Sequence, residues 1–228
     1  VIRAHLESGG TAYVCADGEL LRYAGRDRQS ICVARDIPVT LDAAARHNIA
    51  NSLAAAALTE CLGLTVDEIR DGLLTMSQDA NPGRSNLYAV GGYQVLVDFA
   101  HNPQAMQALF AMARAVPGKR RALCFGQAGD RTDEQIRELA RSAWSIGLDL
   151  AIVSELEHYR RGREPGEVFD IIRDELLNCG AEESQVRHFE KEADSFDAAL
   201  DWAKPGDLVV ILDLGRVSNI QEKLRDMR

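Results

Sequence analysis

The sequence predicts an α/β protein in which a domain with a mostly parallel sheet follows a smaller α+β region. From about residue 80, apolar runs of strand length alternate with segments of helical periodicity, which is typical of a parallel sheet covered on both faces. Residues 11–40 instead contain short apolar runs separated by turns, and one long helical pattern follows them. The polar segment Gln78–Pro82 has no periodicity, so we place the boundary there and expect domains at 1–79 and 80–228.

The first region is expected to hold a small sheet and two helices. From Leu41 to Cys61 apolar residues recur at every fourth position, which predicts a helix with one buried stripe, and Gly63 ends it. Thr65 and Glu68 have the spacing of a capping box, which predicts a second, shorter helix. The expected strands are Thr11–Ala16, Leu20–Tyr23 and Ser30–Ala34.

The second region is expected to alternate strands with helices. Gly91-Gly92 joins the first two strands as an antiparallel hairpin. Asn102 and Pro103 suit the N-cap and first position of a helix, and Thr132 and Gln135 form another capping box. The expected strands are Leu87–Val90, Tyr93–Asp98, Arg121–Gly126, Leu148–Ser154, Gln185–Phe189 and Asp207–Leu212. Further helices are expected at Pro165–Leu177, at Asp194–Ala203 and at the C-terminal end.

Composition and charge exclude several classes of function. A formal charge of −9 without a basic stripe argues against nucleic-acid binding, and no apolar run is long enough to cross a bilayer. Five cysteines without a C-x-x-C pair indicate reduced thiols packed in the core and hence a cytoplasmic protein. The start Val1–His5 has neither signal-peptide features nor an initiator Met, so we expect a fragment of a longer protein.

Two amides on the long helix are candidates for recognition of a base. Asn48 and Asn51 are three residues apart, so both are expected to project from one face, opposite the apolar stripe. An amide donates and accepts at once, as contact with an adenine edge requires. The alternative is a solvated polar face.

An acid and an imidazole flank an expected strand-to-helix turn. Asp98 ends a strand and His101 precedes a helix, where open α/β sheets bind ligands and a helix N-terminus favours phosphate. With Arg84 fourteen residues before Asp98, they would bring a cation, an acid and an imidazole to one nucleotide-sized site. The alternatives are a turn carboxylate for Asp98 and a loop imidazole for His101.

Two loops after later strands are further candidates. Gly126–Arg131 resembles a dinucleotide-binding loop but lacks the G-x-G-x-x-G spacing, and the charged segment Glu155–Gly166 is expected to be a long irregular loop. A solvated surface loop is the alternative for the second segment. The chain contains no G-x-x-x-x-G-K-[ST] phosphate-binding loop.

These motifs, in this order, resemble the central-to-C-terminal passage of Mur-type amide ligases. The matching motifs are His47-Asn48-x-x-Asn51-x-x-Ala54-Ala55, Asn81-Pro-Gly-Arg84, Asp98-Phe-Ala-His-Asn-Pro103 and Gly129-Asp-Arg131. Within that superfamily, Asn81–Leu87, Arg161-Gly-Arg163, Gly166–Val168 and Pro205–Ile211 are most similar to the cyanophycin synthetase branch.

The resemblance implies a fold and a reaction. It implies that residues 1–79 are the C-terminal part of a central ATP-binding domain and that residues 80–228 are a Rossmann-like C-terminal domain. In the family, ATP and Mg²⁺ activate a carboxylate as an acyl phosphate, and an amine attacks to form an amide or isopeptide bond. The cyanophycin branch joins arginine to aspartate side chains. The family's P-loop and metal ligands would lie before Val1, so no metal ligand is assigned, and we expect the chain alone to be inactive.

The resemblance also implies roles for individual residues. The residues that would contact the nucleotide are Asn48 and Asn51 at the adenine, Arg84 and Asp98 at the ribose and phosphates, and His101 at the terminal phosphate. Arg84 and His101 would be catalytic. The residues expected to face the amino-acid or peptide substrate are Asp130, Arg131, Arg161 and Arg163. Relatives of this kind assemble from several subunits, so a homo-oligomer is compatible with the resemblance.

Three other hypotheses remain open. The chain could serve another Mur-type ligase, of the peptidoglycan or folylpolyglutamate kind. It could be an unrelated Rossmann module for a dinucleotide, although the spacing in Gly126–Arg131 disfavours this. It could also be a non-catalytic interaction domain that keeps only the fold.

Overall fold

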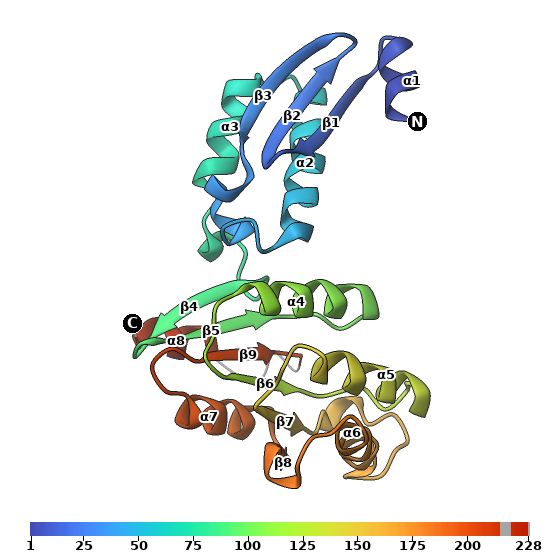
Figure 1. Cartoon of the computed structure of the whole chain (residues 1–228), viewed down its shortest axis with the longest axis vertical. Coiled ribbons are helices and arrows are strands. Elements are labelled where there is room, and N and C mark those ends of the chain that lie inside the picture. Colours follow the sequence, from blue (N-terminus) through green and yellow to red (C-terminus); the bar gives the residue numbers. More distant parts are fainter. Residues whose placement is uncertain (215–219, 228) are drawn as a thin grey trace. The chain divides into compact units, whose positions relative to one another are not determined.

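The computed structural model describes residues 1–214 and 220–227, which form two compact units. The first unit is Val1–Asn81 and the second is Pro82–Arg228 (Figure 1). No helix of the described residues is long and apolar enough to cross a membrane. Each unit has a hydrophobic core of its own, so the two are described separately.

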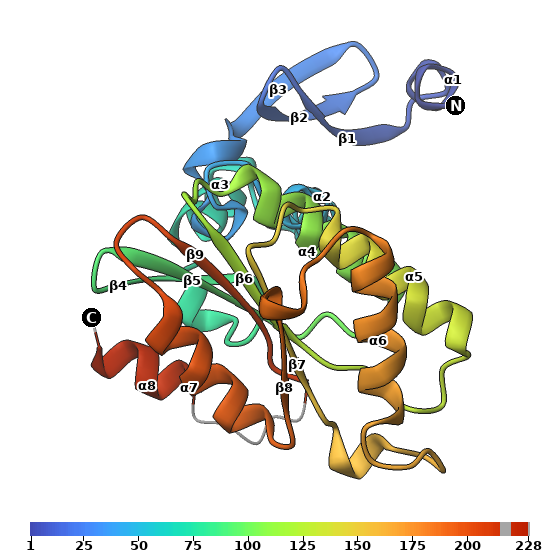
Figure 2. The same cartoon turned by 60° about the horizontal axis from the view of Figure 1, so that its bottom comes forward.

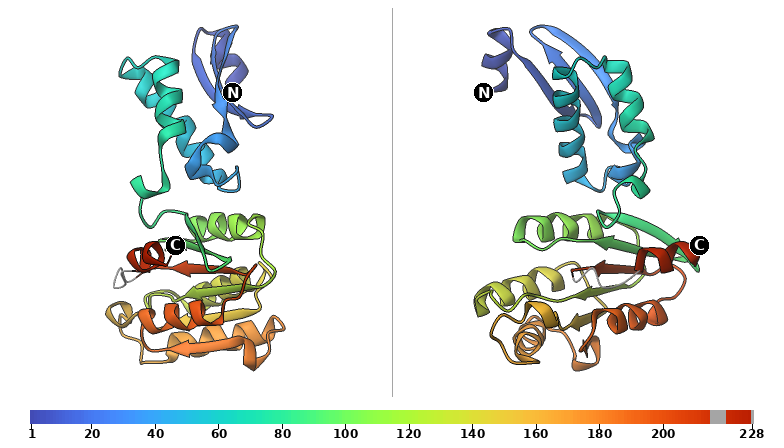
Figure 3. Two further views of the ribbon diagram at one scale, coloured as in Figure 1. Left: turned by 90° about the vertical axis from the view of Figure 1, so that its left-hand side faces the viewer. Right: turned by 180° about the vertical axis from the view of Figure 1, so that it is seen from behind.

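The first unit is a three-stranded antiparallel sheet with two helices packed against it (Figure 3). Its elements are α1 (Ile2–Glu7), β1 (Thr11–Ala16), β2 (Glu19–Ala24), β3 (Asp27–Val33), α2 (Arg46–Cys61) and α3 (Val66–Thr75). Short 3-10 turns occupy Ala34–Asp36, Pro38–Thr40 and Gln78–Ala80. The three predicted strands are confirmed, as is the capping box of Thr65 and Glu68 at the start of α3. The short helix α1 was not predicted from the sequence.

The long helix of this unit begins later than its apolar pattern suggested. Leu41, Asp42 and Ala43 have φ values of 52°, 54° and 65°, so the chain makes a left-handed turn there and α2 starts at Arg46. The backbone N–H of Ala45 donates to the carbonyl of Thr40, which closes the turn at 2.8 Å. The four-residue spacing of apolar residues from Leu41 therefore includes a turn that is not helical.

The cysteine prediction is only partly right. All five thiols are free, but Cys15 and Cys61 are exposed and Cys179 is half-buried. Cys32 and Cys124 are the buried ones, and burial raises the pKa of both thiols. Packing in the core therefore describes two of the five residues.

The second unit is a six-stranded sheet with the order β4-β5-β9-β6-β7-β8. β4 pairs antiparallel with β5, and the other neighbours are parallel, which confirms the predicted mostly parallel α/β fold. The strands are β4 (Asn86–Val90), β5 (Tyr93–Asp98), β6 (Arg121–Phe125), β7 (Leu150–Ser154), β8 (Val186–Phe189) and β9 (Leu208–Leu212). The helices are α4 (Pro103–Ala115), α5 (Asp133–Trp144), α6 (Glu167–Asn178), α7 (Glu192–Trp202) and α8 (Ile220–Asp226), with 3-10 turns at Glu157–Tyr159 and Glu183–Gln185.

Helices cover both faces of this sheet. In Figure 2, α4, α5 and α6 lie on one face, whereas α7 and α8 lie on the other. Alternate strand residues such as Val95, Val97 and Ile211 pack with Phe196 on the α7 side. The central strands are buried throughout, as expected for parallel strands between two helical layers.

Local signals fix where the elements of this unit begin. Gly91 and Gly92 have φ values of 53° and 85°, which suits a two-residue hairpin and confirms the predicted turn. Asn102 accepts a hydrogen bond from the Ala105 N–H at 2.9 Å, so it caps α4 as predicted. The Thr132 capping box at α5 is also confirmed. These caps place the residues just before them at the carboxyl edge of the sheet.

An ion pair at the opposite, amino-terminal edge predicts a pH-dependent stability. Burial alone would raise the pKa of Asp207, but hydrogen bonds from Arg120 and from the Lys204 N–H outweigh it and hold that pKa below its usual value. The folded-state pKa is depressed, so the stabilisation is present above the unfolded pKa and is lost as the pH falls through the folded pKa.

We expect Asp207→Asn to lower the free energy of unfolding at pH 7 by about 1–2 kcal/mol, at the low end for charged hydrogen bonds because the Arg120 side chain is 35% exposed. Urea unfolding should show this difference shrinking between pH 5 and pH 2. The control Asp197→Asn removes an exposed ion pair with Lys223 and should change stability by less than about 0.5 kcal/mol. A pH-independent difference for Asp207→Asn would contradict the ion-pair explanation.

Candidate active site

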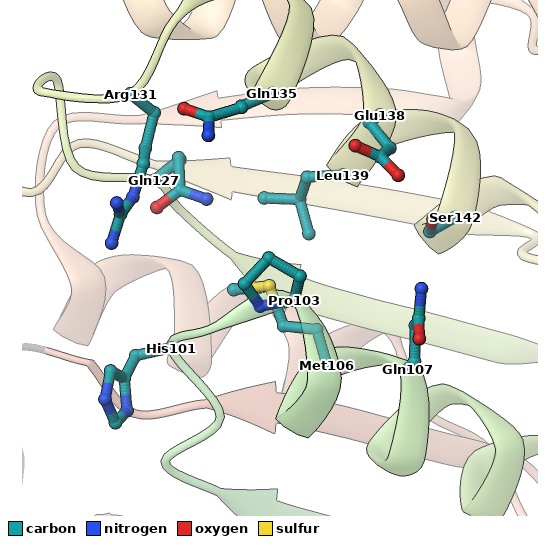
Figure 4. A pocket seen from close by; sticks show the side chains of 10 residues that line it. All are labelled: His101, Pro103, Met106, Gln107, Gln127, Arg131, Gln135, Glu138, Leu139 and Ser142. Atoms are coloured by element: carbon teal, nitrogen blue, oxygen red, sulfur yellow. The ribbon is translucent and has the colours of Figure 1, made fainter.

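Loops from four strands meet at the carboxyl edge of the second unit's sheet. They follow β5, β6, β7 and β9, and together they line a cavity of about 150 Å³. A second cavity of about 160 Å³ lies between α4 and α5 (Figure 4). His101, Gln127 and Arg131 line both cavities, so these three residues form a shared wall. The sequence-predicted candidates after β5, β6 and β7 are thus brought to one edge.

Phe99 brings two of the predicted residues, Arg84 and His101, together. The Arg84 guanidinium carbon lies 5.1 Å from the centroid of the Phe99 ring, within the range of a cation–π contact. The His101 ring centroid lies 5.0 Å from the same ring, at a tilt of 45°. Both Arg84 and His101 are exposed, so a cation and an imidazole face solvent from one aromatic support.

The His101 hydrogen bond fixes which nitrogen is available. Its Nδ1 lies 3.1 Å from the Phe99 carbonyl oxygen, which can only accept, so Nδ1 carries a proton. In the neutral ring Nε2 is then an acceptor, and only the imidazolium donates from Nε2. A contact between Nε2 and a phosphate oxygen therefore requires His101 to be charged.

Asp98 is held by the turn that precedes β4. It is 9% exposed, and its Oδ2 accepts from the Ser85 N–H at 2.7 Å and from the Ser85 hydroxyl at 3.0 Å. Ser85 has φ of 53°, an unusual conformation for a non-glycine residue, and these bonds stabilise it. The structure thus gives Asp98 the role of a turn carboxylate beside Arg84, and a contact with ribose stays a prediction.

The two candidate loops after β6 and β7 are joined to each other. The Gly129 N–H donates to the Tyr159 carbonyl at 2.8 Å, and Arg161 forms an ion pair with Asp130. A Cβ at Gly129 would lie 1.9 Å from the Arg160 carbonyl oxygen, so only glycine fits there. A Cβ at Gly126 would likewise lie 2.6 Å from the Ser154 carbonyl oxygen.

Arg163 supports the loop and lines neither cavity. Its guanidinium donates to the carbonyls of Gly129 and Arg131 at 2.9 and 2.8 Å. It also pairs with Asp133 and Glu167, each at 2.7 Å, and the hydrogen bond from Arg163 to Asp133 helps to hold the Arg163 pKa above its usual value. The structure gives Arg163 a positioning role, because its donors are used within the protein, and a contact with substrate stays a prediction.

We expect Arg163→Ala to loosen the loop at Gly129–Asp133. The loss of several charge-assisted hydrogen bonds should lower the free energy of unfolding by about 1–3 kcal/mol. Arg163→Lys should recover only part of this, since an ammonium cannot reproduce the fork of a guanidinium. Limited proteolysis should cut both variants faster between β6 and α5. Equal cleavage of Arg163→Ala and the unmodified chain would contradict the positioning role.

The amides of α2 differ from their prediction. Asn48 is 7% exposed and lies on the buried face, so the expectation that it projects opposite the packed stripe is wrong. Its Nδ2 donates to the Val39 carbonyl at 2.7 Å, which offsets the cost of burying an amide. Asn51 is exposed and donates to Asn48 Oδ1 at 3.3 Å. Both lie in the first unit, and their contact with adenine stays a prediction.

Some lining residues were not predicted from the sequence. Gln107 and Glu138 come from exposed positions of α4 and α5, where a polar residue is the ordinary choice. Tyr159 lies in the expected irregular loop but was not singled out. That Gln107 and Glu138 line one cavity follows only from the packing of α4 against α5. Within residues 1–214 and 220–227, no group of three His, Cys, Asp or Glu side chains is arranged to hold a metal ion.

Comparison with known proteins gives a family match. The model of the family described as "Mur ligase, glutamate ligase domain" matches residues 83–212. Cyanophycin synthetase from Crocosphaera subtropica is 33% identical over 213 residues, which cover 92% of this chain and 24% of that protein. Cyanophycin synthetase from Nostoc sp. is 34% identical over 214 residues, covering 93% and 23%. The chain thus spans about a quarter of the length of these curated relatives.

A solved structure shows the same fold. The structure of E. coli FolC in complex with ADP, without folate substrate, matches with a TM-score of 0.66. The identity is 22%, and the match covers 95% of this chain and 46% of that chain. This likeness extends through both units, and it confirms the predicted α/β architecture.

Proposed function

This chain belongs to the Mur ligase superfamily, and we propose that it functions in an ATP-dependent ligase that joins a carboxylate to an amine through an acyl phosphate. The observation that carries the proposal is that Phe99 holds the guanidinium of Arg84 and the imidazole of His101, and that His101 lines two cavities. Transfer of a phosphoryl group concentrates negative charge on its oxygens, and fixed donors there lower the barrier.

The proposed chemistry has two steps. A carboxylate oxygen attacks the γ-phosphorus of ATP, the bond to ADP breaks, and an acyl phosphate forms. The unprotonated amine then attacks the acyl carbon, phosphate leaves and the amine loses a proton. Arg84 and His101 bind the phosphoryl oxygens in both steps. Residues of the loop after β6, among them Arg131, hold the amine substrate.

The finer part of the proposal concerns the substrates. Identities of 33–34% to cyanophycin synthetases over more than nine-tenths of this chain support arginine as the amine and an aspartate side chain as the carboxylate. ATP would be used with Mg²⁺, in the cytoplasm, and the protein would assemble as a homo-oligomer. We assign residues 1–79 to the C-terminal part of a central ATP-binding domain and residues 80–228 to the C-terminal domain.

We expect the purified 228-residue chain to be inactive by itself, because its sequence contains no P-loop to hold the phosphates of ATP. Release of ADP from ATP, followed with aspartate peptide and arginine present, should equal the background without protein. Sustained, substrate-dependent ADP release by this chain would contradict that expectation.

The full-length protein tests the proposed function. Purified with ATP, Mg²⁺, an aspartate peptide and arginine, it should release ADP only when both substrates are present, and mass spectrometry should show the peptide heavier by one arginine less water. Release of AMP, or ADP release without amide formation, would contradict the proposal. Tight binding of NADH would instead favour a dinucleotide-binding module.

A further inference from the structure

The cavity between α4 and α5 has opposite charges at its two ends. Figure 4 shows His101 and Arg131 at one end, and Glu138 with Gln107 and Ser142 at the other. Glu138 lies five residues after Asp133, the first residue of α5, which is about 7.5 Å at the 1.5 Å rise of a helix, and Arg131 lies before that helix. Between the two ends lie the apolar side chains of Pro103, Met106 and Leu139. We call this cavity the α4–α5 slot.

The charged groups of the slot are not used by the fold. In the described parts of the chain, no hydrogen bond or ion pair engages the Glu138 carboxylate or the Arg131 guanidinium. Their neighbours differ: Glu134 on the same helix pairs with Arg141, and Asp130 in the same loop pairs with Arg161. The neighbouring 150 Å³ cavity therefore offers a neutralised acid, whereas the slot offers an acid that no described residue neutralises.

We propose that the α4–α5 slot holds the amine substrate and that Glu138 determines its specificity. The substrate's carboxylate pairs with Arg131, its stem lies on Pro103, Met106 and Leu139, and a basic group at the end of the side chain binds Glu138. The proposal rests on the proposed ligase function and adds the location and the selecting residue. The class of substrate is an amino acid with a long aliphatic side chain that ends in a cation.

Size and position agree with this assignment. A volume of about 160 Å³ is smaller than the roughly 300–1,000 Å³ of sites for drug-sized ligands, which suits a single amino acid and not a nucleotide. The end with Arg131 also contains His101, so a substrate bound in this direction places its α-amine beside the proposed phosphoryl site. The basic group of the substrate's side chain then lies away from the acyl phosphate. Its nitrogen atoms therefore do not compete with the α-amine for the acyl carbon.

The kinetic test compares arginine with citrulline, its uncharged analogue, in the full-length protein. Glu138→Gln keeps the shape of the side chain but removes its charge, so we expect KM for arginine to rise about tenfold to hundredfold, as for a lost charge-assisted hydrogen bond. In the same variant, KM for citrulline and KM for ATP should each change by less than about threefold. The control Glu134→Gln, on the α6 side of the same helix, should leave all three values unchanged.

The outcomes separate the slot from the proposed function. Ligation that proceeds with an unchanged KM for arginine in Glu138→Gln, or with equal losses for arginine and citrulline, overturns the slot assignment and leaves the ligase intact. Absence of amide formation with any amine overturns the proposed function. Calorimetry of arginine binding to the same proteins tests the slot without turnover. Weaker binding by Glu138→Gln than by Glu134→Gln supports it, and equal binding by the two variants contradicts it.

Discussion

We expect His101→Ala and Arg84→Ala, each introduced into the full-length protein, to lower kcat for ligation by about 10²–10³-fold, as for removal of one fixed donor from a site of developing charge. Neither change should disturb the fold, because both side chains are exposed and contact mainly Phe99. KM for the amine should change little, since Arg131 and Glu138, the two charged residues proposed to bind the amine substrate, remain. Steady-state kinetics with arginine and an aspartate peptide would measure both values.

His101 variants can also show whether donation is what matters. His101→Gln retains an amide N–H that can donate to a phosphate oxygen, so it should recover part of the activity that His101→Ala loses. The exposed Arg114 of α4 provides a control, since Arg114→Ala removes an equal charge away from the cavities. Full activity of both Arg84→Ala and His101→Ala would instead favour a non-catalytic interaction domain.

The second large effect is expected from Gly129→Ala. Its Cβ would lie 1.9 Å from the Arg160 carbonyl oxygen and 2.8 Å from the carbonyl carbon, both of which are backbone atoms that cannot turn aside. We expect the free energy of unfolding of the second unit to fall by about 1–3 kcal/mol, as for overpacked sites. The joined loops should also separate, which moves Asp130 and Arg131 and raises KM for the amine.

Gly72→Ala is the matched control for this substitution. Gly72 lies in α3, and a Cβ added there would meet nothing within 4 Å, so alanine should stabilise the first unit by about 0.5–1 kcal/mol. Urea unfolding of the 228-residue chain can follow both variants, with the transition of the affected unit compared in each. An unchanged transition for Gly129→Ala would show that the two loops are not packed as described.

The regular elements were predictable from local patterns. The strands of the second unit, the hairpin at Gly91-Gly92 and the caps at Asn102 and Thr132 all depend on residues close together in the sequence. The start of α2 was not predictable in this way, because the apolar spacing from Leu41 continued through a left-handed turn. Periodicity shows which residues are apolar and does not show where backbone hydrogen bonding begins.

The sequence predicted which residues belong to the site better than it predicted the contacts between them. Position after a strand identified His101 and the loop at Asp130, and the structure places both at the carboxyl edge. The sequence could not show that Arg163 supports that loop, since its partners within the loop lie 30 to 34 residues away. Nor could it show that Glu138 stands opposite α4, because this requires the packing of two helices.

The path of one oxygen atom tests the proposed acyl phosphate most directly. An aspartate peptide labelled with ¹⁸O in its side-chain carboxylate would be incubated with the full-length protein, ATP, Mg²⁺ and arginine, and the mass of the released phosphate would be measured. Attack of the carboxylate on the γ-phosphorus predicts one ¹⁸O in each phosphate and one retained in the new amide. Unlabelled phosphate, or label in AMP, would contradict the proposed mechanism.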